Sequence, residues 1–139
     1  MSLDLFIIRI LTSVLTGFII GFERQWNHKS AGLRTNTLAS VGSAVFVLLS
    51  FYITAGSGGD VTRIIAQVVT GIGFIGAGII FKEGFNVRGL TTAVTIWCSS
   101  AIGCFAGAGF LKEAITASMI VVLVNVVLKP LDTWLSNRK

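Results

Sequence analysis

Long apolar stretches separated by short polar segments make up most of this chain. Five of the stretches, residues 5–22, 37–54, 63–81, 91–110 and 114–129, approach or reach the length of a membrane span. A helix needs roughly 20 apolar residues to cross the hydrocarbon core of a bilayer. The segments between them are too short to fold separately. The pattern therefore predicts an all-α membrane protein of five transmembrane helices, forming a single transmembrane domain over residues 1–139.

Small residues in these stretches indicate where helices pack. The first stretch carries Ser13, Gly17 and Gly21 at helical spacing, which allows close approach where lipid supplies no hydrophobic drive between helices. The third stretch has glycines on two sides, so we expect it to be a central helix. The glycines assigned to helix packing are Gly17, Gly21, Gly71, Gly73, Gly76 and Gly78.

Three of these glycines, Gly71, Gly73 and Gly76, also spell the G-x-G-x-x-G dinucleotide fingerprint. That fingerprint needs a preceding strand and a tight turn at a helix N-terminus. Here the glycines lie inside an apolar stretch of span length, so helix packing is the better interpretation. The fourth stretch is small and weakly polar, which predicts a helix shielded from lipid. The fifth is rich in Ile, Val and Leu, which predicts a peripheral helix closed by Pro130.

An internal repeat relates the two halves of the chain. The pattern Arg-Ile, Val, Thr-Gly begins at Arg9 and again at Arg63, and Gly-Leu-Arg-Thr at residues 32–35 is echoed by Gly-Leu-Thr-Thr at residues 89–92. Both copies enter the membrane from the same side, so the sequence predicts a parallel repeat of helix pairs 1–2 and 3–4. Membrane proteins built from repeats tend to keep working residues at the shared interface.

Composition supports a membrane protein and charge gives its orientation. Hydrophobic residues make up 53% of the chain and charged residues 12%, with a mean hydropathy of +0.85. Outside the spans, one side carries eight basic residues and the other carries only Lys112. The positive-inside rule then predicts an N-out, C-in topology, and it explains the net charge of +5 better than nucleic-acid binding does. The eight are Arg24, Lys29, Arg34, Lys82, Arg88, Lys129, Arg138 and Lys139.

The cytoplasmic loops hold the most polar segments. We expect Thr35 or Asn36 to cap the second helix and the repeat-related threonines of the partner loop to cap the fourth. With Arg34 and Arg88 beside them, two such helix N-termini are suited to an anion or a lipid phosphate. Alternatively, Arg34 and Arg88 pair with Glu23 and Glu83, and these ion pairs only hold the two loops together. The residues assigned to this surface are Glu23, Arg24, Gln25, Lys29, Arg34, Thr35, Asn36, Glu83, Arg88, Thr91 and Thr92.

Two further arginines, Arg9 and Arg63, lie near the outer ends of their spans. They are either interface anchors or a paired outer-leaflet site. Gln67, one turn deeper than Arg63, is expected to make an interhelical hydrogen bond. For catalysis the inventory is poor: His28 is the single histidine, in a polar loop, and no nucleophile–base set is evident. We therefore expect no enzyme, no cofactor and no metal site.

The order and content of four sequence blocks carry a family resemblance. They are Gly-Phe-Glu-Arg-Gln at 21–25, Ala-Gly-Leu-Arg-Thr-Asn at 31–36, Gln-Val-Val-Thr-Gly-Ile-Gly-Phe-Ile-Gly-Ala-Gly at 67–78, and Gly-Leu-Thr-Thr-Ala at 89–93 followed by Trp97. The chain resembles the MgtC/SapB family of multi-pass bacterial inner-membrane proteins. The resemblance implies five spans and a role in magnesium limitation, acid stress and virulence. It also implies regulation through membrane partners such as the ATP synthase. Many relatives carry an ACT-like domain after the last span, and we expect only the membrane domain here.

These observations lead to one expected function and one alternative. The first is a non-enzymatic regulatory membrane protein, a homodimer or higher oligomer, that binds a membrane partner or lipid headgroups through its cytoplasmic loops. The alternative is a transporter or channel for Mg²⁺ or another ion, with hydroxyls or backbone carbonyls of the fourth span lining a path. Magnesium favours oxygen ligands, especially carboxylates. All six acidic residues lie near span ends.

Overall fold

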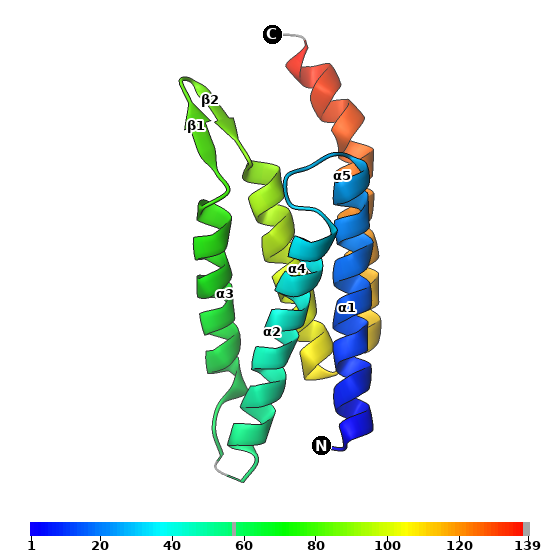
Figure 1. The fold of residues 1–139 in the computed structure, drawn as a ribbon, viewed down its shortest axis with the longest axis vertical. Helices are drawn as coiled ribbons and strands as arrows, with labels where there is room; N and C mark the ends of the chain where they lie inside the picture. Colours follow the sequence, from blue (N-terminus) through cyan, green and yellow to red (C-terminus); the bar gives the residue numbers. More distant parts are fainter. Residues whose placement is uncertain (57, 138–139) are drawn as a thin grey trace.

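The described part of the chain, residues 1–56 and 58–137, is a bundle of five helices with one small β-hairpin in this computed structural model (Figure 1). The helices are α1 (Leu3–Trp26), α2 (Leu33–Thr54), α3 (Val61–Ala77), α4 (Leu90–Ala108) and α5 (Leu111–Ser136), and the strands are β1 (Phe81–Glu83) and β2 (Asn86–Arg88). The prediction of five helices is therefore confirmed. Successive helices run in opposite directions along the bundle.

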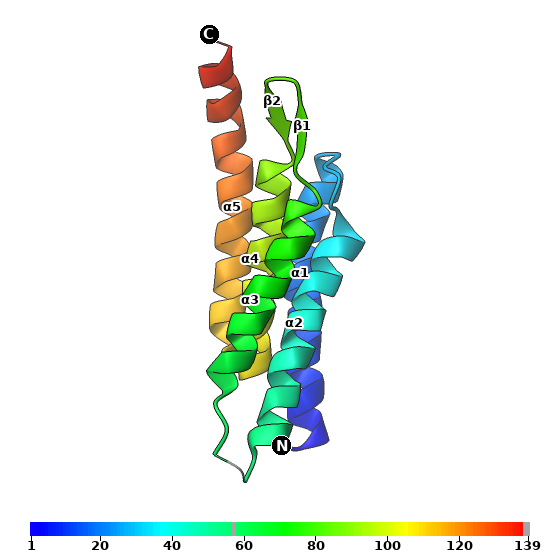
Figure 2. The same ribbon diagram turned by 90° about the vertical axis from the view of Figure 1, so that its left-hand side faces the viewer.

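One end of the bundle gathers the loop at residues 27–32, the β-hairpin and the C-terminal part of α5 (Figures 1 and 2). We call it the basic end, because Lys29, Arg34, Lys82, Arg88 and Lys129 lie there. Two residues counted in the charge asymmetry, Arg138 and Lys139, lie outside the described residues. The N-out orientation and the internal repeat stay predictions.

Helix α4 forms the centre of the bundle and contacts all four other helices. Its small residues explain this position, since they let α2 approach closely. A Cβ atom on Gly107 would lie 2.7 Å from the carbonyl oxygen of Ala44, and one on Gly103 would lie 2.7 Å from the carbonyl carbon of Ser40. The predicted shielding of the fourth span is confirmed.

Helix α1 packs on α2 through the predicted small-residue stripe. A Cβ atom on Gly17 would lie 2.7 Å from the Cα of Thr37, and one on Gly21 would lie 2.7 Å from the Cα of Leu33. Ser13 is fully buried on the same side. The assignment of these residues to helix packing is therefore confirmed.

The prediction that the third span is a central helix is wrong for the described residues. Helix α3 packs mainly against α2 and α4, and only Ile72 and Gly76 on it are buried. A Cβ atom on Gly76 would lie 3.6 Å from the Cβ of Ala93, whereas Gly71 and Gly73 face no protein atom within 4 Å. A glycine pattern shows where a helix surface is smooth, but it does not show whether a neighbour covers that surface.

Helix boundaries also differ from the predicted spans. Four helices have the length and apolarity of a membrane crossing; α3 is apolar but has 17 residues, or about 26 Å. It ends at Ala77, with Gly78 as its C-cap rather than a packing residue. Helix α5 lies at the periphery as predicted but continues through Pro130 to Ser136. Proline keeps a helical φ but has no N–H, so the carbonyl oxygen of Val126, four residues earlier, loses its helical donor.

The β-hairpin between α3 and α4 was not predicted. Phe81 pairs with Arg88 and Glu83 pairs with Asn86, which leaves a two-residue turn of Gly84 and Phe85. Gly84 has a φ of +62°, as a type II′ turn requires at its first central position. Each strand has only three residues, too few for an alternation of apolar and polar positions to stand out beside an apolar span.

Asp60 caps the N-terminus of α3. Its Oδ1 accepts hydrogen bonds from the backbone N–H of Thr62 at 2.8 Å and from the Thr62 hydroxyl at 2.6 Å. These bonds favour the carboxylate and lower the pKa of Asp60. The cap therefore stabilises the first turn of α3 fully above the ordinary carboxyl pKa of about 3.9, and this stabilisation is lost as pH falls through the lowered value.

We expect Asp60→Ala to fray the first turn of α3, because the N–H of Thr62 loses its acceptor. Amide hydrogen exchange at Thr62 should become faster above pH 4, while exchange in α1 stays unchanged. The control Asp60→Asn keeps a capping oxygen and should retain protection without the acid transition. Equal exchange at Thr62 in the wild type and the alanine variant would contradict this role.

Candidate functional site

A buried polar seam joins α2 to α4. Asn36 is fully buried, and its Nδ2 donates to the carbonyl oxygens of Ala31 at 3.0 Å and Gly32 at 2.9 Å. Its Oδ1 accepts from the Ser99 hydroxyl at 2.9 Å. Further along the helices, the hydroxyls of Ser43 and Ser100 lie 2.6 Å apart. The side chains of Asn36, Ser99, Ser43 and Ser100 thus bond to one another across the two helices.

Arg24 extends this seam toward the basic end. The sequence placed residues 23–25 in a loop, but α1 continues through Trp26. The Arg24 side chain is 2% exposed, its Nη2 donates to the Thr92 hydroxyl at 2.7 Å, and its Nε has no partner. The contact with α4 explains why the helix continues, because the guanidinium turns into the bundle and not toward solvent.

The predicted side-chain caps of α2 and α4 are wrong. The N-cap residues are Gly32 and Gly89, and neither helix has a side-chain cap hydrogen bond. Gly89 has a φ of +89°, and a Cβ there would overlap the carbonyl oxygen of Ile79. The candidate caps divide into two groups: Thr35 and Thr91 are exposed, whereas Asn36 and Thr92 are buried and bonded across the bundle.

Glu23 holds α1 to α5 at the basic end. Its Oε1 accepts from the amide of Asn27 at 2.7 Å, and its Oε2 accepts from the amide of Asn125 at 3.2 Å. The Oδ1 of Asn27 in turn accepts from Lys129 Nζ at 2.6 Å. Sequence reasoning missed Asn27, Asn125 and Lys129 as members of this cluster. A polar Asn125 inside an apolar stretch was the available signal.

The two basic-end arginines have different surroundings. Arg88 lies 3.6 Å from Glu83 across the hairpin, in an exposed ion pair. Arg34 is exposed and has no hydrogen-bond or ion-pair partner among the described residues, since Glu23 is engaged with the two asparagines. The prediction that both arginines pair with glutamates is therefore confirmed for Arg88 and wrong for Arg34. Lys29 and Gln25 are exposed nearby.

The arginines of the opposite end do not share a set of contacts. Arg9 donates from Nη1 to the carbonyl oxygen of Gly107 at 2.9 Å, and its guanidinium lies 5.7 Å from the ring centre of Phe51. Arg9 therefore ties α1 to α4 and α2. Arg63 is exposed on α3. Gln67 is exposed as well and makes no hydrogen bond with a described residue, so the predicted interhelical bond is wrong.

Residues 1–56 and 58–137 contain no group of three or more His, Cys, Asp or Glu side chains placed to hold a metal ion. The arrangement is instead a network of hydroxyl, amide and guanidinium groups. Such a network can fix the relative positions of α1, α2 and α4, and it leaves Arg34 and the hairpin free for external contacts.

Apolar helices around a buried polar seam define an α-helical, multi-span membrane protein. Residues 10–134 match the MgtC family, and the chain belongs to that family.

Named relatives support the assignment. The chain is 56% identical over 117 residues to "Protein MgtC" of Brucella abortus (strain 2308), covering 84% of this chain and 48% of that protein. It is 49% identical over 124 residues to "Protein MgtC" of Salmonella typhimurium (strain LT2), covering 89% and 52%. It is 45% identical over 132 residues to "Uncharacterized protein slr0014" of Synechocystis, covering 95% and 56%. The chain thus spans about half the length of these relatives. No solved structure matches.

Proposed function

We propose that this chain is a non-enzymatic regulatory protein of the bacterial inner membrane that binds another membrane component at its cytoplasmic face. A contrast within the molecule carries the proposal. The seam between α2 and α4 is filled by polar groups bonded to one another, whereas at the basic end Arg34 has no partner among the described residues. Internally bonded polar groups and a free charge at one end suit binding better than conduction.

The orientation predicted from charge supports the same proposal. With the N-terminus outside, the basic end faces the cytoplasm and the anionic headgroups of the inner leaflet. The β-hairpin projects there, with Phe85 fully exposed at its turn (Figure 1). A membrane-protein partner such as the ATP synthase, or a second copy of the chain, would meet this surface. The role in magnesium limitation and acid stress comes from the family resemblance.

The packing of α2 against α4 favours regulation over the ion-transport alternative. A path along the polar fourth helix would need space beside its small residues. At Gly103 and Gly107 that space is taken by the backbone of Ser40 and Ala44, which lies within 3 Å of where a Cβ would stand. The hydroxyls that a pore would use are bonded to each other instead.

We expect the double variant Arg34→Ala/Arg88→Ala to lose function while inserting normally in the membrane. Both side chains are exposed, so their removal leaves the buried seam intact. In a host strain that lacks its own family member, growth at limiting magnesium should fall to that of the empty vector. The matched control Arg63→Ala/Lys112→Ala removes the same charge from exposed positions at the opposite end of the bundle and should grow like the wild type.

Full growth of the arginine double variant would overturn the proposed role of the basic end. A second measurement addresses transport directly. Purified protein in liposomes loaded with a magnesium-sensitive dye should give no flux above empty vesicles. Flux that depends on the protein would instead favour the transporter.

A further inference from the structure

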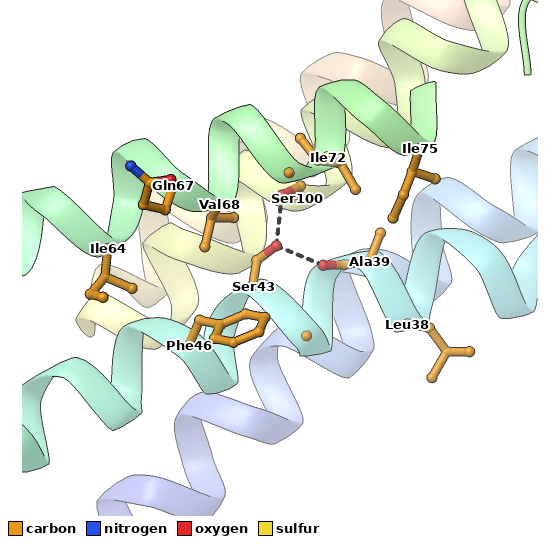
Figure 3. Close-up of a pocket in the computed structure, with 12 residues that line it drawn as sticks. Leu38, Ala39, Ser43, Phe46, Ile64, Gln67, Val68, Ile72, Ile75 and Ser100 are labelled. Carbon is orange, nitrogen blue, oxygen red and sulfur yellow. Dashed lines mark hydrogen bonds between the residues drawn. The ribbon is translucent and has the colours of Figure 1, made fainter. Parts of the chain in front are cut away.

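An apolar groove separates α2 from α3 on the side of the bundle that α3 only partly covers. It has a volume of about 490 Å³ (Figure 3). Its lining includes the hydroxyls of Ser43 and Ser100, which lie 2.6 Å apart, and Ser43 also bonds to the carbonyl oxygen of Ala39 at 2.8 Å. Gln67 is a further polar side chain of the lining. The other large side chains of the walls are apolar: Leu38, Phe46, Ile64, Val68, Ile72 and Ile75.

A second cavity of about 500 Å³ continues this groove toward the basic end. The two share four lining residues, two on each helix. The second cavity ends at Arg34 and Thr35, the first polar side chains of α2. Neither cavity has an aspartate or glutamate in its lining, so the charge at the mouth is that of Arg34. The shared residues are Leu38, Ala39, Ile72 and Ile75.

The length of the groove matches one leaflet of a bilayer. Arg34 and Phe46 line opposite ends of its α2 wall, twelve positions apart, which is about 18 Å along a helix. Half of the roughly 30 Å hydrocarbon core is about 15 Å. Along α2 the groove thus extends over about one leaflet from the basic end, and along the shorter α3 it reaches Ile64 in the first turn of that helix.

The lining favours a lipid with a phosphate in its headgroup. The walls are mainly apolar, as an acyl chain requires, and the charged side chain at the mouth is Arg34. Arg34 is exposed and has no partner among the described residues, and a phosphate is a group that an unpaired arginine binds well.

We propose that this groove binds an anionic phospholipid of the cytoplasmic leaflet, with an acyl chain between α2 and α3 and the phosphate at Arg34. The inference rests on the proposed function for its orientation, and it names one membrane component bound at that face. Two glycines in the walls fit this use. Gly42 and Gly71 line the groove, and a Cβ on either would meet no protein atom within 4 Å. Their absent side chains leave space for the acyl chain.

Native mass spectrometry of the purified full chain, titrated with phosphatidylglycerol or with phosphatidylcholine, tests the proposal. The wild type should bind one phosphatidylglycerol per chain in preference to phosphatidylcholine. Gly71→Leu fills the groove and should weaken phosphatidylglycerol binding at least tenfold. Arg34→Gln leaves the groove open and should remove the preference between the two lipids.

Two variants control for folding and for position. Gly73→Leu adds the same side chain to α3 at a position that neither cavity includes, and it should bind lipid like the wild type. Gly42→Leu fills the groove from the α2 wall and should reproduce the loss seen with Gly71→Leu. Thermal unfolding of each variant shows whether it is folded.

Unchanged binding in both filled variants would overturn the proposal, as would an unchanged lipid preference in folded Arg34→Gln. A shift of Gly71→Leu from dimer to monomer without lipid loss would also overturn it, because a second copy would then occupy the groove. The measurement needs no cellular readout. The wild type could bind lipid as expected while the double variant Arg34→Ala/Arg88→Ala still supported growth. That pair of results would reject the regulatory role and leave the lipid site standing.

Discussion

Gly103→Ala should lower the free energy of unfolding by about 1–3 kcal/mol, the usual cost of overpacking a tightly packed helix contact. The added methyl group would overlap the Ser40 carbonyl oxygen and lie 2.8 Å from the Ser40 Cα. These are backbone atoms, which cannot rotate away as a side chain can. Helices α2 and α4 would have to separate, and the hydrogen bond between Ser43 and Ser100 would stretch with them.

Thermal unfolding in mild detergent measures this effect, and Gly73→Ala is the matched control. Gly73 faces no protein atom within 4 Å, so the same methyl group meets no obstacle there. Alanine also has a higher helix propensity than glycine by about 0.8–1 kcal/mol. The control should therefore unfold at the wild-type temperature or above it. A wild-type midpoint for Gly103→Ala would refute the close contact between α2 and α4.

Asn36→Ala should destabilise the protein by about 2–4 kcal/mol, since it removes three hydrogen bonds worth about 0.6–1.5 kcal/mol each. The carbonyls of Ala31 and Gly32 would lose their side-chain donor just before α2 begins. The turn that presents Arg34 would loosen as well, so growth at limiting magnesium should decline along with stability.

A double-mutant cycle with Ser99→Ala separates the contact across the helices from the local ones. The single hydroxyl proton of Ser99 is shared between Asn36 Oδ1 and the carbonyl oxygen of Thr95, so Ser99→Ala removes fewer hydrogen bonds than Asn36→Ala and should cost less stability. The coupling free energy between Asn36 and Ser99 should be about 0.5–1.5 kcal/mol. Thr35→Ala, an exposed neighbour, should leave stability unchanged. Additive effects of the two substitutions would mean that the bond contributes nothing.

Much of the fold could be predicted from the sequence because a membrane constrains helices strongly. Every backbone polar group must be bonded within the hydrocarbon core, so a long apolar stretch is read as a helix with little ambiguity. The small-residue stripe of α1 and the buried character of α4 followed from composition for the same reason. The ends of the helices did not, because Arg24 and Pro130 are helical through contacts and exposure that composition does not reveal.

The candidate site was predicted only as a set of residue types. Polar residues at the basic end were identified, but their partners lie far away in the chain, as with Glu23 and Asn125 or Arg24 and Thr92. Which arginine is free depends on which glutamate is already occupied. No local pattern contains that information.

Hydropathy, sequence motifs and charge were enough to identify an α-helical membrane protein of the MgtC family, with glycines for helix packing and a surplus of basic residues on one side. The length of each apolar stretch and the charge of each loop can be read from neighbouring residues, without knowledge of the packing. Three features became visible only in the folded bundle: which glycines meet a neighbour, that α4 and not α3 is central, and that Arg34 lies at the mouth of an apolar groove. These features depend on how helices distant in sequence pack together, and that packing follows from the shapes of all the surfaces at once.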